Sequence, residues 1–174
     1  MASIPATTTT VAILVCVLFC ATADTAVAVA TDNPDLPDYV IQGRVYCDTC
    51  RAGFVTNVTD YIAGAKVRLE CSHFGTGELE RAIDGVTDAT GTYTIELKDS
   101  HEEDICQVVL VQSPREDCDQ VQALRDRAGV LLTRNVGISD SLRPANPLGY
   151  LKDVPLPVCA ALLKQLDSDD DDDQ

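Results

Sequence analysis

The chain has 174 residues and a formal net charge of −15, because 28 acidic residues outnumber 13 basic ones. Nucleic acids and anionic membrane lipids are bound by basic surfaces, so this charge argues against both as partners. The length fits a single folded domain of ordinary size together with an amino-terminal leader.

An apolar run over residues 11–21 is predicted to be the core of a signal peptide. It has the length of such a core and is too short to cross a membrane as a helix. Small residues with the spacing of a cleavage site follow at 21–23 and again at 28–30. We therefore predict a signal peptide over 1–30, cut between residues 23 and 30, and a secreted chain with no membrane span.

Beyond the leader, three stretches alternate apolar and polar side chains with the two-residue period of a β-strand. They lie at 40–47, 66–71 and 92–97. The side chains expected to face the core are Ile41, Gly43 and Val45, then Val67, Leu69 and Cys71, then Tyr93, Ile95 and Leu97. Before the third stretch, residues 87–91 are typical of a turn, in which Gly91 can adopt positive φ.

The carboxy-terminal half carries weaker patterns. Residues 106–111 are almost all apolar and predict a buried strand, and 130–138 is a weaker strand candidate. Residues 121–128 are compatible with one or two helical turns. The stretch 155–166 is the better helix candidate, since its apolar residues recur at helical spacing. The acidic run 167–174 repels itself and is predicted to be a disordered tail.

Many short strands separated by turns predict an all-β fold, namely an antiparallel Greek-key β-barrel or sandwich with a short carboxy-terminal helix. Residues 62–69 and 87–93 are similar, in order and spacing, to the "G-A-x-V-x-L … T-D-x-x-G-x-Y" pattern of transthyretin-like β-sandwiches. We predict a loose segment over 31–38, the β domain over 39–166 and the acidic tail after it.

Six cysteines remain once the leader is removed, and an even number in a secreted chain predicts three disulfides. They are Cys47, Cys50, Cys71, Cys106, Cys118 and Cys159. The residues alone allow fifteen pairings. Cys47 and Cys50 form a C-x-x-C motif, but a redox-active pair begins a helix, whereas this one follows a strand and precedes Gly53. A zinc site would need a second such pair, so we expect structural disulfides and no metal.

Side chains able to act as acids, bases or nucleophiles are present without a catalytic pattern. His73 and His101 each follow a serine, but neither lies in a nucleophile elbow or a recognisable triad. The acids of 102–104 could serve a glycosidase in principle, yet adjacent acids in a loop are usually solvated. The aspartates of 169–173 lack the spacing and the glycine of a calcium loop. We therefore predict no catalytic residues, no metal and no cofactor.

Asn57-Val58-Thr59 is an N-glycosylation sequon with no proline in its middle position. It falls between the first two predicted strands, where a loop would expose it. In a secreted chain we therefore predict a glycan on Asn57.

The most specific motif runs from Gly43 to Arg51 and contains the closely spaced cysteine pair. Its residues are Gly43, Val45, Tyr46, Cys47, Asp48, Cys50 and Arg51. Together with residues 146–150 (NPLGY) and the spacing of the six cysteines, this motif resembles the signature of the pollen Ole e I-like family. The resemblance covers 39–166, and residues 125–128 are closest in pattern to the grass-pollen members.

The resemblance implies the disulfides Cys47–Cys118, Cys50–Cys159 and Cys71–Cys106. It also implies a secreted, non-enzymatic glycoprotein of pollen or the plant cell wall, located in the extracellular space, with a recognition role in pollen hydration, germination or pollen-tube growth. The partner that it implies is a cell-surface receptor ectodomain or a wall polysaccharide, and IgE if the protein is an allergen.

Two other classes of protein stay open as alternatives. One is an extracellular protease inhibitor, for which 112–119 is a candidate reactive loop carrying Arg115. The other is a carbohydrate hydrolase, for which the sequence offers no organised pair of acids.

Overall fold

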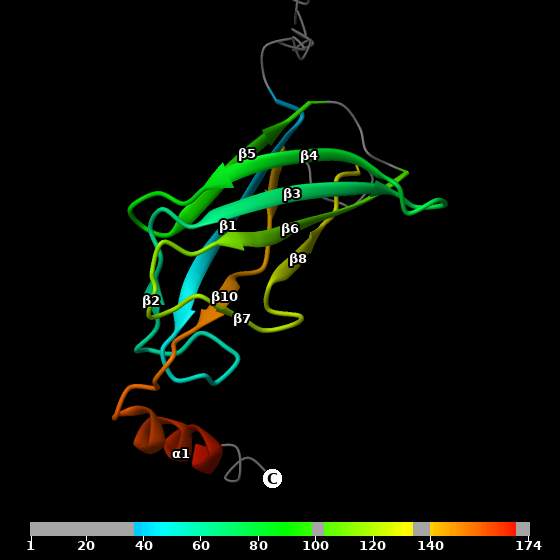
Figure 1. Cartoon of the computed structure of the whole chain (residues 1–174). Coiled ribbons are helices and arrows are strands. Elements are labelled where there is room, and N and C mark those ends of the chain that lie inside the picture. The colour runs from blue at the N-terminus through cyan, green and yellow to red at the C-terminus, as the bar shows by residue number, and fades with distance from the viewer. Residues whose placement is uncertain (1–36, 99–102, 134–139, 170–174) are drawn as a thin grey trace, which may run out of the picture. The chain divides into compact units, whose positions relative to one another are not determined.

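The computed structural model describes residues 37–98, 103–133 and 140–169, with side chains as far as Leu166. All of them belong to one compact unit, Asp35–Gln174. In these ranges the chain forms ten strands and one helix (Figure 1). They are β1 (Tyr39–Asp48), β2 (Asp60–Tyr61), β3 (Lys66–His73), β4 (Leu79–Val86), β5 (Thr92–Leu97), β6 (Asp104–Gln112), β7 (Gln120–Val121), β8 (Arg127–Val130), β9 (Leu142–Pro144), β10 (Leu148–Leu151) and α1 (Cys159–Asp169). The predicted signal peptide lies outside the described residues.

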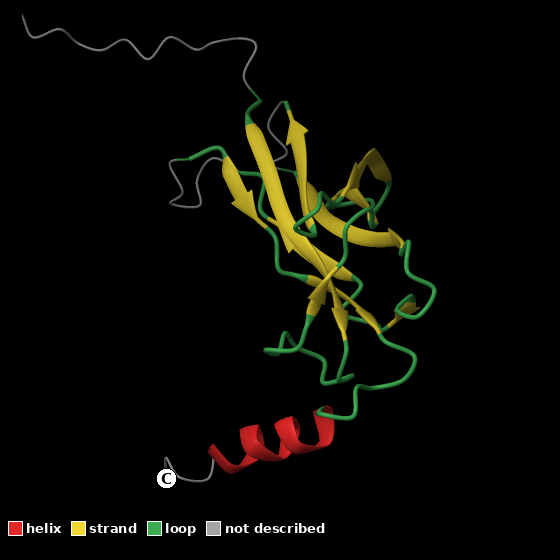
Figure 2. Ribbon diagram, turned by 90° about the vertical axis from the view of Figure 1, so that its left-hand side faces the viewer, coloured by secondary structure: helices red, strands yellow, loops and turns green. Residues whose placement is uncertain are grey.

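The strands form two sheets (Figure 2). In the first, β1 is central: β2 and β5 pair with it antiparallel, whereas β9 and β10 pair with it in parallel. β7 extends this sheet by pairing with β10. The second sheet has the order β4-β3-β6-β8 and is antiparallel throughout. Apolar side chains from both sheets form one buried core, which includes Ile41, Val67 and Val108.

The predicted fold class is confirmed in its coarse form and corrected in its detail. The chain is mostly β with one short carboxy-terminal helix and three disulfides, as expected. It is not a closed barrel, and its first sheet is mixed rather than antiparallel, because residues 142–151 return along β1 in the same direction as β1. The Greek-key connection stays a prediction.

The three alternating stretches are confirmed as β1, β3 and β5, with their predicted inward residues buried. The turn at 87–91 is confirmed as well. The Asp88 carboxylate accepts hydrogen bonds from the Thr90 hydroxyl at 2.7 Å and from the backbone N–H groups of Thr92 and Thr90 at 3.0 and 2.7 Å, which together lower the pKa of Asp88. Gly91 adopts a φ of 73°, and a Cβ there would lie 2.7 Å from the Cβ of Tyr61.

Four other expectations need correction. The strand around 106–111 is buried on one face only, since Ile105 and Val111 are exposed and the second sheet faces the core with one side. Residues 121–128 are not helical: Val121 ends β7, 122–126 form a turn, and 127–128 begin β8. The strand expected over 130–138 ends at Val130 as β8, and residues 134–139 lie outside the described ranges. The helix begins at Cys159 rather than Pro155 and continues to Asp169.

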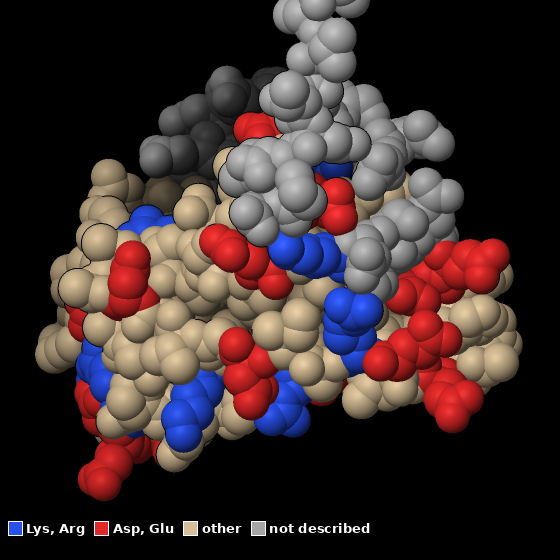
Figure 3. All heavy atoms as spheres, turned by 90° about the horizontal axis from the view of Figure 1, so that it is seen from above, with Lys and Arg blue, Asp and Glu red and all other residues tan. Residues whose placement is uncertain are grey.

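The described helix is too short and too polar to cross a membrane. On the face seen in Figure 3, Lys and Arg side chains are interspersed with Asp and Glu side chains and do not gather into a continuous basic area. That distribution agrees with the acidic composition, which argues against a nucleic-acid partner.

The burial of two core tyrosines leads us to expect a loss of stability at high pH. Tyr93 and Tyr150 are almost fully buried, and within the described part of the chain their hydroxyls have no hydrogen-bond partner. Burial raises the pKa of Tyr93 and raises that of Tyr150 to about 12. Above pH ~10 the unfolded chain therefore releases protons that the folded chain retains, so the free energy of unfolding falls as pH rises.

We expect a loss of roughly 1–3 kcal/mol between pH ~10 and ~12, with a much shallower decline in the Y93F/Y150F variant. Urea unfolding at a series of pH values measures this, and tyrosine emission can be followed alone because the chain has 5 Tyr and no Trp. An equally steep decline in the double variant would contradict the assignment.

Candidate functional site

The C-x-x-C cysteines do not pair with each other. Disulfides join Cys47 to Cys118, Cys50 to Cys159 and Cys71 to Cys106, with Cα–Cα distances of 6.0, 5.2 and 4.1 Å. These are the same pairs that the family resemblance implies. All six cysteines are buried and bonded in these disulfides, so the described residues contain no free thiol able to act as a nucleophile or redox centre.

We predict the same connectivity in the purified protein. A digest that cuts before Asp48, and so separates Cys47 from Cys50, should yield three cross-linked peptides without reduction, and reduction should separate each of them. Mild reduction before digestion should leave them intact, because buried disulfides are shielded from thiols. A peptide in which Cys47 is joined to Cys50 would refute the pairing.

The carboxylate of Asp48 organises the loop that contains the cysteine pair. Asp48 is buried, and its oxygens accept hydrogen bonds from the backbone N–H groups of Cys50, Ala52 and Gly53 at 3.3, 3.0 and 2.6 Å. A carboxylate that binds several backbone donors fixes the conformation of a loop strongly. The sequence identified Asp48 only as part of a motif, because an aspartate after a strand usually lies in an exposed turn.

Side chains of the same loop connect it to distant segments. Arg51 adopts a φ of 54°, and its Nη1 donates to the Gln120 side chain at 2.8 Å and to the Lys152 carbonyl at 2.7 Å. The buried Thr49 hydroxyl donates to the Val58 carbonyl at 2.8 Å. The disulfides of Cys47 and Cys50, on either side of Thr49, connect the loop to Cys118 and Cys159. The loop is therefore the point at which β7, the 54–59 segment and the chain after β10 are joined.

The other signature residues explain how β1 packs. Val45 lies in the core, and Gly43 makes room for a ring: a Cβ there would lie 2.2 Å from the Tyr93 hydroxyl oxygen. Tyr46 is buried against Gly149 of β10, where a Cβ would lie 2.6 Å from the Tyr46 ring. The signature is thus mainly a packing motif.

An exposed apolar side chain stands beside this loop. Leu124, in the turn between β7 and β8, is 85% exposed and has a φ of 71°. Its neighbours hold the turn: the Arg125 carbonyl accepts from Gly149 N–H at 3.1 Å, and the Arg125 guanidinium lies against Gly53. A left-handed backbone costs a leucine about 1–2 kcal/mol, and such strain is concentrated at functional positions.

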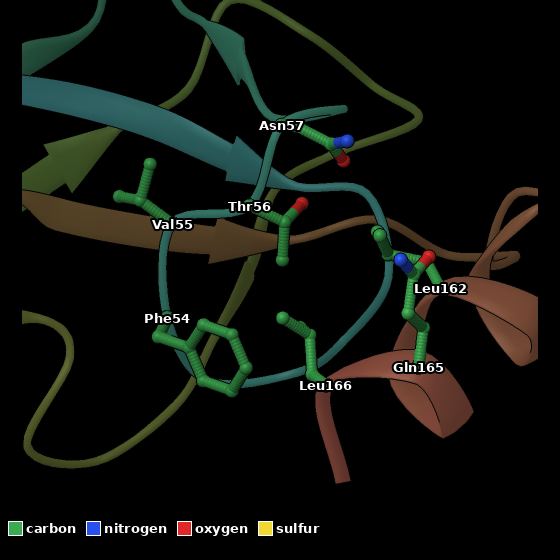
Figure 4. Close-up of a pocket in the computed structure, with 7 residues that line it drawn as sticks. All are labelled: Phe54, Val55, Thr56, Asn57, Leu162, Gln165 and Leu166. Atoms are coloured by element: carbon green, nitrogen blue, oxygen red, sulfur yellow. The ribbon is translucent and has the colours of Figure 1, made fainter. Parts of the chain in front are cut away.

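A shallow groove lies between the sequon loop and α1 (Figure 4). Its volume is about 360 Å³, and it is lined by Phe54, Val55, Thr56, Asn57, Leu162, Gln165 and Leu166. Asn57 is exposed in a turn that is closed by a hydrogen bond from Thr59 N–H to the Thr56 carbonyl at 3.2 Å.

The candidate inhibitory loop at 112–119 does not present Arg115 freely. The Arg115 guanidinium pairs with Asp117 at 2.9 Å and with Asp60 at 3.4 Å, and Lys152 contacts the same Asp117 carboxylate. Hydrogen bonds from Arg115 and Lys152 hold the pKa of Asp117 well below its usual range. A protease-binding arginine must enter the specificity pocket of its target, so this geometry does not favour an inhibitor of that kind.

The remaining candidates are not brought together. The Nδ1 of His73 accepts from the backbone N–H groups of Gly75 and Thr76 at 3.1 and 3.3 Å, so His73 belongs to the β3–β4 turn. His101 and the first acid of 102–104 lie outside the described residues, as do most of the aspartates of the tail. In the part of the chain that is described, no three His, Cys, Asp or Glu side chains gather as a metal site requires.

Comparison with known proteins gives this structure a context. A family model described as "Pollen protein Ole e 1 like" matches residues 37–167. The chain is 84% identical to Pollen-specific protein C13 of Zea mays over 178 residues, covering 100% of each. It is 44% identical to Major pollen allergen Lol p 11 of Lolium perenne, over 74% of this chain and 96% of that protein. The crystal structure of the major plantain pollen allergen Pla l 1 matches with a TM-score of 0.61 and 27% identity, covering 68% of this chain and 97% of the other.

The fold and the site define a disulfide-linked protein of two β-sheets, with a loop surface rather than a catalytic arrangement among its described residues. The chain belongs to the Ole e 1-like family of pollen proteins. The resemblance to grass-pollen members is also confirmed. None of the relatives named above carries the name of an enzyme.

Proposed function

We propose that this is a secreted, non-enzymatic pollen glycoprotein that acts as a recognition module in pollen hydration, germination or pollen-tube growth. Its signal peptide is removed between residues 23 and 30, and the mature protein acts in the extracellular space or the cell wall. The partner is the ectodomain of a cell-surface receptor. A role in pollen is supported by relatives that are named as pollen-specific proteins and pollen allergens. IgE binding would follow from similarity to the allergens.

The observation that carries the proposal is the position of Leu124. The Leu124 side chain is 85% exposed, so it contributes little to the stability of the fold, and its left-handed backbone is unfavourable. Its neighbour Arg125 lies against Gly53 of the loop that Asp48 fixes, and the Arg125 carbonyl accepts a hydrogen bond from Gly149 N–H, so the turn that carries Leu124 is attached to that loop and to β10. Rigid loops that expose apolar side chains favour binding, because little conformational entropy is lost on association.

Affinity capture tests the receptor hypothesis. The oxidised protein is immobilised, and extracts of pollen and stigma surfaces are passed over it. We expect a receptor ectodomain to be retained by the natural chain and lost with L124S. The matched control is F74S, which changes an equally exposed apolar residue (76%) in the β3–β4 turn. Retention of pectic polysaccharide without a receptor would favour the alternative, a wall polysaccharide-binding protein. Equal retention by both variants would show that Leu124 is not the contact.

The proposal includes a glycan on Asn57. The sequon loop is exposed, and the compartment is the one in which N-glycosylation occurs. Intact mass before and after glycosidase treatment should differ by one N-glycan, and the N57Q variant should lack that difference. An unchanged mass would refute occupancy.

A further inference from the structure

We propose that the first sugar of the glycan on Asn57 lies in the groove between the sequon loop and α1, and that it holds the helix against that loop. The inference rests on the proposed glycosylation and goes beyond it. It assigns the sugar a position on the protein and a structural role.

The sequon loop and α1 both contribute side chains to the groove, next to the glycan attachment point. Asn57 itself lines it, together with Phe54 of the same loop and Leu162 and Leu166 of α1. In Figure 4 the side chain of Asn57 extends to the side on which Leu162 and Gln165 lie, while Phe54 stands at the other end of the loop. A sugar bonded to the Asn57 amide is therefore already at the edge of the groove.

The lining matches the two kinds of surface that a pyranose presents. Phe54 and Leu166 are 45% and 40% exposed, so apolar surface remains open to a partner. The C–H face and the acetamido methyl of N-acetylglucosamine are apolar, and C–H groups are attracted to the negative face of an aromatic ring. The amide of Gln165 offers a donor and an acceptor for the hydroxyls. A volume of about 360 Å³ is large enough for a small ligand.

The order of synthesis places the glycan on Asn57 before α1 is present to form the groove. The chain is made from its amino terminus, so Asn57 enters the secretory compartment long before α1 does. The disulfide that ties α1 to the loop joins residues 109 positions apart and forms only when Cys159 has emerged. The groove is thus closed by a helix that packs against a loop already carrying its sugar.

The covalent attachment of α1 to the loop lies at its first residue, Cys159. Cys159 anchors its first residue to Cys50, and the backbone before it is held by a hydrogen bond from Leu156 N–H to the Thr49 carbonyl at 3.0 Å. Further along α1, Leu162, Gln165 and Leu166 line the groove opposite the sequon loop. A sugar between Phe54 and Leu162 would extend the attachment from the disulfide to the second half of the helix.

The test compares glycoforms of the intact secreted chain made in a eukaryotic host. An endoglycosidase that leaves one N-acetylglucosamine provides the single-sugar form, and N57Q provides the sugar-free form. We expect the amides of residues 161–166 to exchange with deuterium about tenfold more slowly in the single-sugar form, the effect of removing a few tens of Å² of apolar surface from water. The acetamido methyl should also show a nuclear Overhauser contact with the Phe54 ring.

Two variants keep the test specific. F54S should abolish the difference between the glycoforms if the sugar stacks on Phe54. F74N in the N57Q background moves the sequon to the β3–β4 turn, ahead of Thr76, and its glycan should leave exchange in α1 as fast as in N57Q.

The outcomes separate the two proposals. An occupied Asn57 with equal exchange in all forms, or protection given equally by the moved glycan, would overturn the groove position and leave the glycosylation intact. An unoccupied Asn57 would overturn both. Protection that requires a second copy of the chain, seen as a dependence on protein concentration, would assign the groove to self-association and overturn the proposal as well.

Discussion

Replacement of Asp48 by alanine is expected to lower the free energy of unfolding by about 3–5 kcal/mol and to reduce the yield of folded protein sharply. The change removes the acceptor of three backbone N–H groups, those of Cys50, Ala52 and Gly53. Each buried donor left without an acceptor costs roughly 1–3 kcal/mol, and the site is too enclosed for water to replace the carboxylate fully. Urea unfolding of the purified protein, followed by tyrosine emission, gives the difference.

Two further variants distinguish this role from a general effect of removing an acidic side chain. D48N keeps one oxygen acceptor, so it should lose roughly half as much stability as D48A. Asp84 is largely exposed and pairs with Arg68 at 2.6 Å, and D84A should have a much smaller effect because exposed ion pairs contribute little. If D48A and D84A behaved alike, the three hydrogen bonds would not be what fixes the signature loop.

The strands differ in how far their own residues predict them. The stretches that became β3 and β5 were predictable because a half-buried strand carries its own alternation of apolar and polar residues. β4 carries no such alternation: it is an edge strand with no buried residue, so its pattern resembles a loop. Partnership with β3, rather than its own composition, makes it a strand.

The segment 121–128 differs from its predicted helical turns for a related reason. Its residues are good helix formers, but tertiary pairing of β7 with β10 and of β8 with β6 takes both ends of the segment into sheets. The parallel pairing of β1 with β9 and β10 was equally hidden, because it joins segments about a hundred residues apart. Local patterns contain no information about such crossovers.

The site was predictable in its residues and not in its geometry. The cysteines, Asn57 and the signature could be named from the sequence, whereas the disulfide pairing came from the family resemblance alone. The buried position of Asp48 and the strained backbone of Leu124 had no sequence signal, since both depend on the surrounding fold. The groove could not be foreseen either, because α1 and the sequon loop are about a hundred residues apart and are brought together by the disulfide between Cys50 and Cys159.

Removal of the disulfide between Cys50 and Cys159 is expected to have the second large effect. The double variant C50A/C159A should lose about 2–5 kcal/mol of stability, because this bridge closes a loop of 109 residues and restricts the unfolded chain strongly. It should also release α1 locally, since the bridge fixes the first residue of the helix. Trypsin cleavage after Lys164 measures the local effect under native conditions, and urea unfolding measures the global one.

The variant C71A/C106A separates these two effects. Its bridge joins neighbouring strands of the second sheet and closes a loop of 35 residues, so the loss of stability should be smaller by roughly 1 kcal/mol. Cleavage after Lys164 should stay as slow as in the natural chain, because the attachment of α1 is untouched. Equal cleavage in both double variants would mean that α1 follows global unfolding. In that case neither the disulfide nor a sugar in the groove would be needed to keep the helix in place.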